Sequence, residues 1–257
     1  MANVDRRWHP LDERYVERYG SRHEGDAREA DESPASGPRC PLCLAELVFT
    51  HRRRGGFRYY RHLDNAADAR CPLTTPSYEP PGLAVAAPLD EPAGLAHRER
   101  FLQHWQRHYR LARQAAPPLT LERFARLIEY ADVVGLWRYP AFDERDAPYV
   151  LLALAGFLSV HEPDSRARIR LWFDGSVRDV GDLLSETRAT PAKLFKLTYH
   201  EPLHTPFPTS SDILFWEPVE RFDRLADCTA PRLRQTQVRA FNRFLDSYER
   251  ERATRDA

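Results

Sequence analysis

The feature that most constrains this chain is a set of three cysteines and one histidine within a single short segment. Cys40 and Cys43 form a Cys-Pro-Leu-Cys pair, His62 follows a stretch rich in aromatic residues, and Cys71 completes the set. Zinc in proteins is held by four such nitrogen and sulfur ligands in a tetrahedron, and a set without an open position is typical of structural sites. These residues therefore predict one structural Zn²⁺ per chain, with Cys40, Cys43, His62 and Cys71 as its ligands.

Two alternatives remain open at this site. His51 competes with His62 for the fourth position, but His62 follows the second predicted strand and lies nearer to Cys71 in the sequence. In the other alternative the thiols are free and the histidine is unrelated to them. Cysteines grouped with a histidine in an intracellular chain favour a metal over disulfides. Cys228 stands alone far downstream and is interpreted as a small buried residue.

The segment that carries these ligands has the pattern of a β-hairpin. Residues 45–50 and 57–62 are both typical of strands, and Gly55 and Gly56 are available for the reversal. Prolines at several positions between 76 and 94 disfavour a regular helix or a central strand. This organisation predicts a charged N-terminal segment (1–38), a zinc ribbon (39–75), a proline-rich linker (76–94) and a larger domain (95–257).

The larger domain mixes helical and strand periodicities. Apolar spacing predicts helices over 97–114, from Thr120 as N-cap toward Trp137, over 148–159 and over 231–253. Residues 168–173 and 176–180 are predicted as two strands around Asp174-Gly175, and 194–199 as another. The chain is therefore expected to be α+β, a zinc ribbon followed by a mixed helical and small antiparallel-sheet domain.

The ligand segment also resembles a known family. Cys40-Pro-Leu-Cys43, the aromatic and basic stretch that ends at His62-Leu63, and Cys71-Pro72 resemble the zinc ribbon of competence-associated CoiA-like bacterial proteins, over about residues 38–75. In that family a nuclease-like domain accompanies the ribbon, so the resemblance implies DNA processing. Nuclease cores of this type use an acid with a Glu-x-Lys sequence to hold the metal. Neither Lys193 nor Lys196 has an acid two residues earlier, so the nuclease activity is not carried over.

The hairpin is rich in arginine and contains no acid between His51 and Arg61. Arginine can hold phosphates in a forked geometry, and aromatic rings can stack on bases. The residues predicted to contact DNA or RNA are Arg52, Arg53, Arg54, Arg58, Tyr59 and Arg61. In the alternative interpretation the aromatic side chains alternate into a small core and the arginines only solubilise the loop.

Other histidine patterns carry no chemistry. His200-Glu-Pro-Leu-His204 matches the sequence of zinc proteases, but Pro202 stands inside the motif and a helix is required there. His104 and His108 lie on an arginine-rich helix and are expected to be solvated surface residues. No catalytic residues are predicted.

The net charge and the lack of a predicted signal sequence or membrane span determine the expected partners and location. The 38 basic and 38 acidic residues cancel, so any nucleic-acid binding must be local. Arginines at the start of the chain are not followed by an apolar stretch, and the run 149–160 is too short to span a bilayer, so we expect a cytoplasmic protein without a membrane partner. The favoured function is a non-catalytic, nucleic-acid-associated or accessory protein in bacterial DNA uptake, mobile-element or defence processes.

Two other functions are retained as alternatives. One is a protein–protein adaptor with purely structural zinc, which would bind its partner through the acidic and aromatic segment near Trp216. The other is a divergent metal-dependent nuclease, with Glu186-Thr-Arg188 as the nearest substitute for the missing motif.

Overall fold

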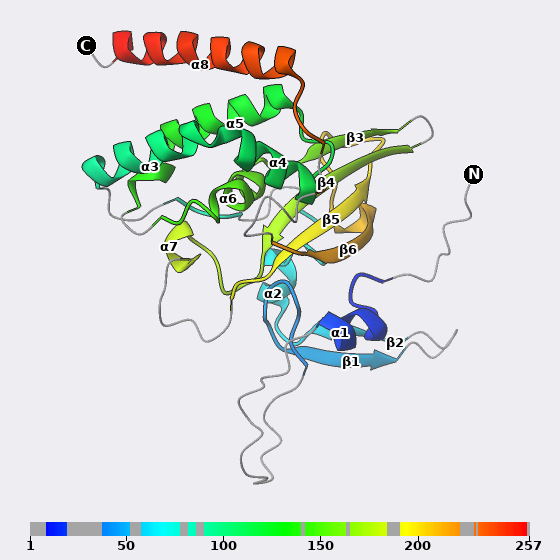
Figure 1. Ribbon diagram of the computed structural model, residues 1–257. Helices are drawn as coiled ribbons and strands as arrows, with labels where there is room; N and C mark the ends of the chain where they lie inside the picture. The colour runs from blue at the N-terminus through cyan, green and yellow to red at the C-terminus, as the bar shows by residue number, and fades with distance from the viewer. Residues whose placement is uncertain are drawn as a thin grey trace.

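A four-stranded antiparallel sheet lies at the centre of the computed structural model (Figure 1). The structure describes residues 9–19, 38–51, 58–77, 82–85, 90–139, 142–162, 165–183, 191–221, 229 and 231–255. The strands follow one another in the order β3-β4-β5-β6, with a second, two-stranded sheet formed by β1 and β2. The predicted α+β class, with small antiparallel sheets, is confirmed.

Each central strand pairs with its neighbour in sequence. The strands are β3 (Leu158–Glu162), β4 (Ser165–Phe173), β5 (Leu194–His200) and β6 (Ile213–Val219). Because side chains alternate along a strand, the sheet offers two faces for packing. Ile169 and Leu171 of β4 belong to one apolar cluster, whereas Phe195 and Leu197 of β5 belong to another. The sheet is therefore buried on both faces.

Helices cover the first face. They are α3 (Glu91–Gln103), α4 (Trp105–Ala115), α5 (Leu121–Val133), α6 (Ala147–Leu154) and α8 (Gln235–Arg255), and α8 is the outermost of them (Figure 1). The short elements on this side are η1 (Leu136–Arg138) and α7 (Val180–Leu183). The Thr120 side chain accepts a hydrogen bond of 3.1 Å from the Arg123 amide, which confirms the predicted N-cap.

The N-terminal part of the chain covers the second face. It comprises α1 (Glu13–Tyr19), β1 (Leu47–His51), β2 (Arg58–His62) and α2 (Asn65–Arg70), while η2 (Ser210–Asp212) precedes β6. The predicted hairpin is confirmed, with Leu47 opposite His62 and His51 opposite Arg58. Leu42 and Leu73 pack in one cluster with Trp216, whose indole nitrogen donates to the Pro10 carbonyl at 2.8 Å. Residues far apart in the sequence thus share one core.

Three predicted elements differ from the observed ones. The predicted helix over 97–114 is two helices, α3 and α4, which meet at His104, and α3 begins at Glu91, within the predicted linker. The apolar run 148–159 is not one helix, because α6 ends at Leu154 and Gly156, with φ +66°, turns the chain into β3. Residues 176–180 do not pair with β4. The Asp174 carboxylate accepts hydrogen bonds from Ser176 and, at 2.6 Å, from the Lys193 amide, so it holds the start of β5 beside β4 instead. None of the described helices has the length and apolarity needed to cross a membrane.

The buried position of His108 also corrects an expectation. His104 is exposed, but His108 is 1% exposed because it lies on the same helical face as Trp105 and Ala112. Its ring stacks on Phe101 with a centroid distance of 4.5 Å, and neither ring nitrogen has a hydrogen-bond partner. Burial, together with the nearby Arg107 and His104, lowers the pKa of His108 to about 3.

This burial predicts acid sensitivity. The unfolded chain takes up a proton on His108 near pH 6.5, whereas the folded chain does so only near pH 3. The stabilising contribution is complete above pH 6.5 and falls by about 1.4 kcal/mol per pH unit below it. We expect His108→Phe to lose less unfolding free energy than the wild type between pH 7 and about pH 5 in urea denaturation.

His204→Phe provides the matched control, because His204 is exposed in the irregular segment after β5 and is not one of the groups that lower the pKa of His108. Its acid dependence should follow that of the wild type. Equal losses in the His108→Phe variant and the wild type would contradict the assignment.

Candidate metal centre

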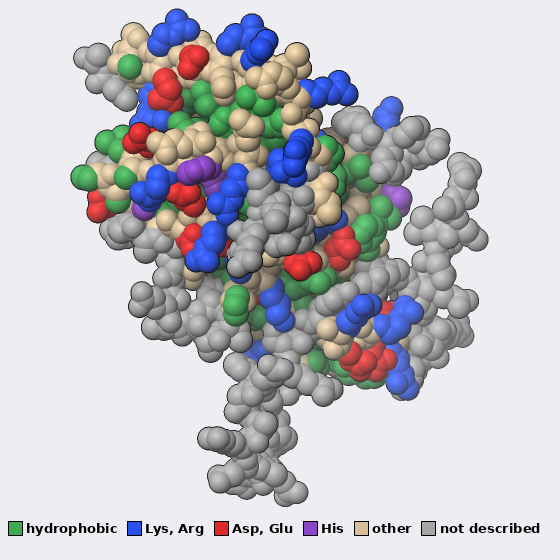
Figure 2. All heavy atoms as spheres, in the orientation of Figure 1, with side chains coloured by type: hydrophobic (Ala, Val, Ile, Leu, Met, Phe, Trp, Pro, Cys, Tyr) green, Lys and Arg blue, Asp and Glu red, His purple; other side chains and the backbone are tan. Residues whose placement is uncertain are grey.

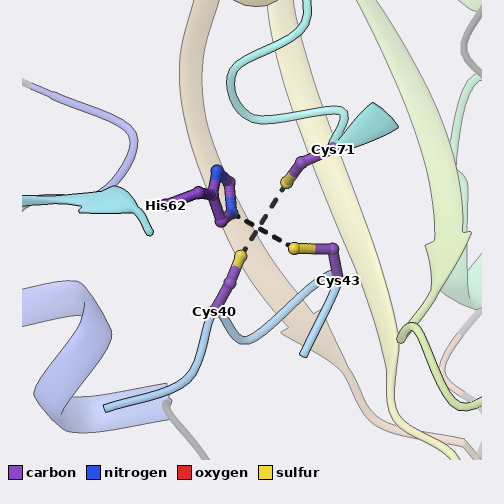
Figure 3. Close-up of side chains that lie close together, drawn as sticks. All are labelled: Cys40, Cys43, His62 and Cys71. Carbon is purple, nitrogen blue, oxygen red and sulfur yellow. Dashed lines mark hydrogen bonds between the residues drawn. The ribbon is translucent and has the colours of Figure 1, made fainter. Parts of the chain in front are cut away.

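The first two ligands lie in a tight loop before β1. The Leu44 amide donates to the Cys40 carbonyl at 2.9 Å, and the Cys40 amide donates to Ala45 at the same distance. Leu44 adopts a left-handed conformation with φ 62°, which reverses the chain directly after Cys43. The loop therefore brings the sulfur atoms of Cys40 and Cys43 to the same centre (Figure 3).

The other two ligands lie at the ends of regular elements. His62 is the last residue of β2 and pairs in register with Leu47, so the hairpin positions its imidazole. Helix α2 begins with Asp64 as N-cap and ends at Cys71, whose amide donates to the Ala67 carbonyl at 2.9 Å. The short helix thus brings Cys71 back beside His62 and the cysteine loop.

The four side chains converge on one centre (Figure 3). Their ligand atoms all lie within 4.8 Å of one another, a group compact enough to hold a metal ion. The sulfur of Cys43 lies 3.2 Å from Nε2 of His62, and the sulfurs of Cys40 and Cys71 are 3.8 Å apart. Cys40, His62 and Cys71 are fully buried, while Cys43 is partly exposed.

A carboxylate fixes the orientation of the histidine ring. Asp68 of α2 lies 2.5 Å from Nδ1 of His62, and the Thr74 hydroxyl donates to the Asp68 carbonyl at 2.9 Å. Histidines that bind metals commonly donate their second ring nitrogen to such a carboxylate. The arrangement leaves Nε2 of His62 directed at the sulfurs. Asp68 was not identified from the sequence, where only its position between His62 and Cys71 could have indicated it.

The four side chains change one another's pKa values. Burial raises the pKa of the Cys40 and Cys71 thiols. Burial lowers the pKa of His62, but hydrogen bonds with Cys40 and Cys43 outweigh it and raise this pKa to about 11. Hydrogen bonds from Cys40 and Cys71 lower the pKa of the Cys43 thiol. The site thus favours a Cys43 thiolate beside a protonated His62. A divalent cation bound by these groups must displace their protons, so its affinity decreases as pH falls.

The cysteine loop is fitted closely against the central sheet. Gly175 follows β4, and a Cβ placed there would lie 2.7 Å from the Cys43 carbonyl carbon. Real Cβ atoms essentially never approach this closely. A residue without a side chain is therefore required where the metal-ligand loop packs on the sheet.

The structure describes only some of the residues that were predicted to contact nucleic acid. Arg52, Arg53 and Arg54 lie outside the described residues, as does Cys228. Arg58 forms an ion pair with Glu13 at 3.7 Å, and Arg61 is exposed. The Tyr59 ring packs against His9 at a centroid distance of 4.4 Å.

The competing histidine patterns lie elsewhere. His51 pairs with Arg58 at the opposite end of the β1–β2 pairing from His62, and its side chain is not described. His200 ends β5, and the residues from Glu201 to Thr209 form bends and irregular backbone. The rejection of a helical His-Glu-x-x-His site is confirmed.

The contact at Gly175 predicts the effect of one methyl group. We expect Gly175→Ala to lower the free energy of unfolding by about 1–3 kcal/mol, because the Cys43 carbonyl must move. Urea denaturation measures this loss. Gly82→Ala is the matched control, since its Cβ would meet only the end of the Arg170 side chain at 3.3 Å. Equal stability of the two variants would contradict a close fit of the loop.

The contact between Asp68 and His62 predicts weaker metal binding when it is removed. We expect Asp68→Ala to lower Zn²⁺ affinity about 10- to 100-fold, because the imidazole loses its orienting partner. Competition with a chromophoric chelator measures the change. Glu46→Gln serves as control, since Glu46 pairs with Arg39 at 3.7 Å. Unchanged affinity in Asp68→Ala would show that the carboxylate does not support the site.

Comparisons with known proteins assign no family. No protein-family model matches the sequence, and no curated protein or solved structure matches it significantly. The functional conclusion therefore rests on the cluster of Cys40, Cys43, His62 and Cys71 and on the surfaces around it.

Proposed function

We propose that the chain is a zinc-ribbon protein that associates with nucleic acid and is not itself a catalyst. Soft thiolates together with an imidazole favour zinc among the common divalent ions. The ligand set has four protein groups, three of them fully buried, which is typical of a structural ion. In this proposal the metal holds the N-terminal unit against the sheet.

The observation that carries the nucleic-acid proposal is the position of the arginine-rich segment on the hairpin. Residues 52–57 join the paired residues His51 and Arg58, at the end of the strands opposite the metal-ligand His62. Arg61 is exposed on the same hairpin. A hairpin fixed at one end by a metal would present these guanidinium groups to phosphates without a large ordering cost. The resemblance to CoiA-like ribbons supports a DNA partner.

The distribution of charge supports a local contact. Figure 2 shows basic side chains spread among acidic ones over the visible face, without one dominant basic patch. This agrees with equal numbers of basic and acidic residues in the whole chain. A partner with many phosphates would therefore be held by a specific element rather than by the general field of the protein.

One observation bears on the adaptor alternative. The adaptor was expected to use Trp216, but this side chain is 1% exposed and its indole nitrogen is bonded to Pro10. For the nuclease, Glu186 and Arg188 lie outside the described residues. Lys196 is paired with Glu217 at 2.7 Å on the neighbouring strand. Neither alternative has a specific observation in its favour.

The proposal predicts salt-dependent binding that requires the hairpin arginines. Metal analysis should first give about one zinc per chain, lost in Cys71→Ser. Fluorescence anisotropy of labelled single- and double-stranded DNA and RNA should then give saturable binding. Replacing Arg52, Arg53 and Arg54 by Ala should weaken binding to duplex DNA and reduce the slope of log K against log salt by about 2–3, because each phosphate contact releases counterions.

A second triple variant controls for the loss of charge. Arg239, Arg243 and Arg250 lie on α8, far along the chain from the hairpin, and their replacement by Ala removes the same charge. This variant should bind as the wild type does. Equal weakening by both triple variants, or no saturable binding to any of the four nucleic acids, would overturn the proposal.

A further inference from the structure

A cleft of about 520 Å³ lies beside the metal centre, at the end of the hairpin opposite the arginine segment. Its walls come from three places that are distant in sequence: the cysteine loop, helix α2, and β4 with the turn that follows it. This volume is within the range of pockets that bind small organic molecules. Nothing in the proposed nucleic-acid contact uses this cleft.

The walls of the cleft are mainly apolar. Leu42 lies on one side, Leu83 on another, and Leu171 and Phe173 of β4 contribute as well. Trp172 adds a flat aromatic surface, and the guanidinium carbon of Arg170 lies 4.9 Å from the centroid of its ring. An apolar body of one or two rings would gain free energy by leaving water here.

Two arginines line the cleft from separate elements. Arg70 is the last residue of α2, and Arg178 lies between β4 and α7. Both side chains are exposed, and neither has a hydrogen bond or an ion pair in the structure. Asp64, the one acid among the described residues that line the cleft, already accepts a hydrogen bond of 2.8 Å from the Ala66 amide as the N-cap of α2. The cleft therefore has an excess of positive charge with free donors.

We propose that this cleft binds a small organic anion that has an apolar, ring-sized body. Arg70 and Arg178 would hold its carboxylate, sulfonate or phosphate group by charge-assisted hydrogen bonds. The apolar walls would hold the body. An apolar pocket alone would not select for charge, and two exposed arginines alone would bind inorganic anions only weakly. The combination selects a molecule that carries both parts.

The probe that tests this pairing is 8-anilinonaphthalene-1-sulfonate, an aromatic sulfonate whose fluorescence increases in apolar sites. We expect saturable binding at one site, and an affinity at least ~10-fold lower in the Arg70→Ala/Arg178→Ala variant, because two charge-assisted contacts are lost. The variant Arg239→Ala/Arg243→Ala removes the same charge from α8 and should bind as the wild type does. Equal affinity in the wild type and the cleft variant would overturn the proposal.

A neutral analogue separates the two parts of the site. N-phenyl-1-naphthylamine has the same ring body without the sulfonate, and its affinity should not change in the arginine variant. Ala66 is an exposed residue of α2 that lines the cleft, so Ala66→Trp should block both probes without disturbing the core. If both probes bind Ala66→Trp as they bind the wild type, they occupy another surface and the proposal is wrong.

Competition then separates the sources of the anion. Phenyl phosphate and octanoate join a phosphate or a carboxylate to an apolar body of different shape. Displacement of the sulfonate probe by either one supports the proposal and identifies the preferred body, and displacement by neither would overturn it. Equal displacement by inorganic phosphate would overturn it, because the walls would then contribute nothing. These experiments use the full chain as purified and require no nucleic acid, so their outcome is independent of the proposed function.

Discussion

The convergence of the side chains of Cys40, Cys43, His62 and Cys71 is the constraint on which the N-terminal part of the structure, residues 9–77, depends. Three separate pieces of chain supply them: a loop before β1, the end of β2 and the residue after α2. The β1–β2 pair is a two-stranded sheet, and such a hairpin is at best marginally stable by itself. The six-residue helix α2 is also too short to be stable alone. Their mutual positions therefore depend on the ligand cluster and on contacts with the rest of the protein.

Those contacts are made with the central sheet. Leu11, Leu42 and Leu73 share an apolar cluster with Phe195, Leu197 and Trp216, so the N-terminal residues 9–77 cover the face of the sheet opposite to α3, α4, α5 and α6. Burial of apolar side chains is the main favourable contribution to such packing. The close fit of the Cys43 carbonyl against Gly175 fixes the depth at which the loop lies. Packing against the sheet and the convergence of the four side chains thus act on the same loop, and the cleft lies where this loop and α2 meet β4.

The sequence predicted the local features well where one short pattern decides them. The ligand set follows from cysteine and histidine spacing, and the N-cap at Thr120 follows from the preference of a helix start for a hydroxyl. The predictions were wrong where contacts with residues distant in the sequence determine the local structure. Residues 176–180 have strand-like composition, but the Asp174 carboxylate bonds to Lys193 and places β5 beside β4. His108 was expected at the surface because its own neighbours in sequence are charged, yet it packs under Phe101.

The sequence by itself determined the α+β class, the hairpin, and the four residues able to hold a metal, because these depend on residue type and on spacing along the chain. Only the tertiary structure decided that Asp68 orients His62, that Trp216 is a core residue, and that Arg70 and Arg178 line one cleft. The physical reason is the distance along the chain between the interacting groups. The carbonyl of Pro10 and the indole of Trp216 meet only because the N-terminal residues pack on the sheet that contains β6. No local sequence pattern encodes that contact.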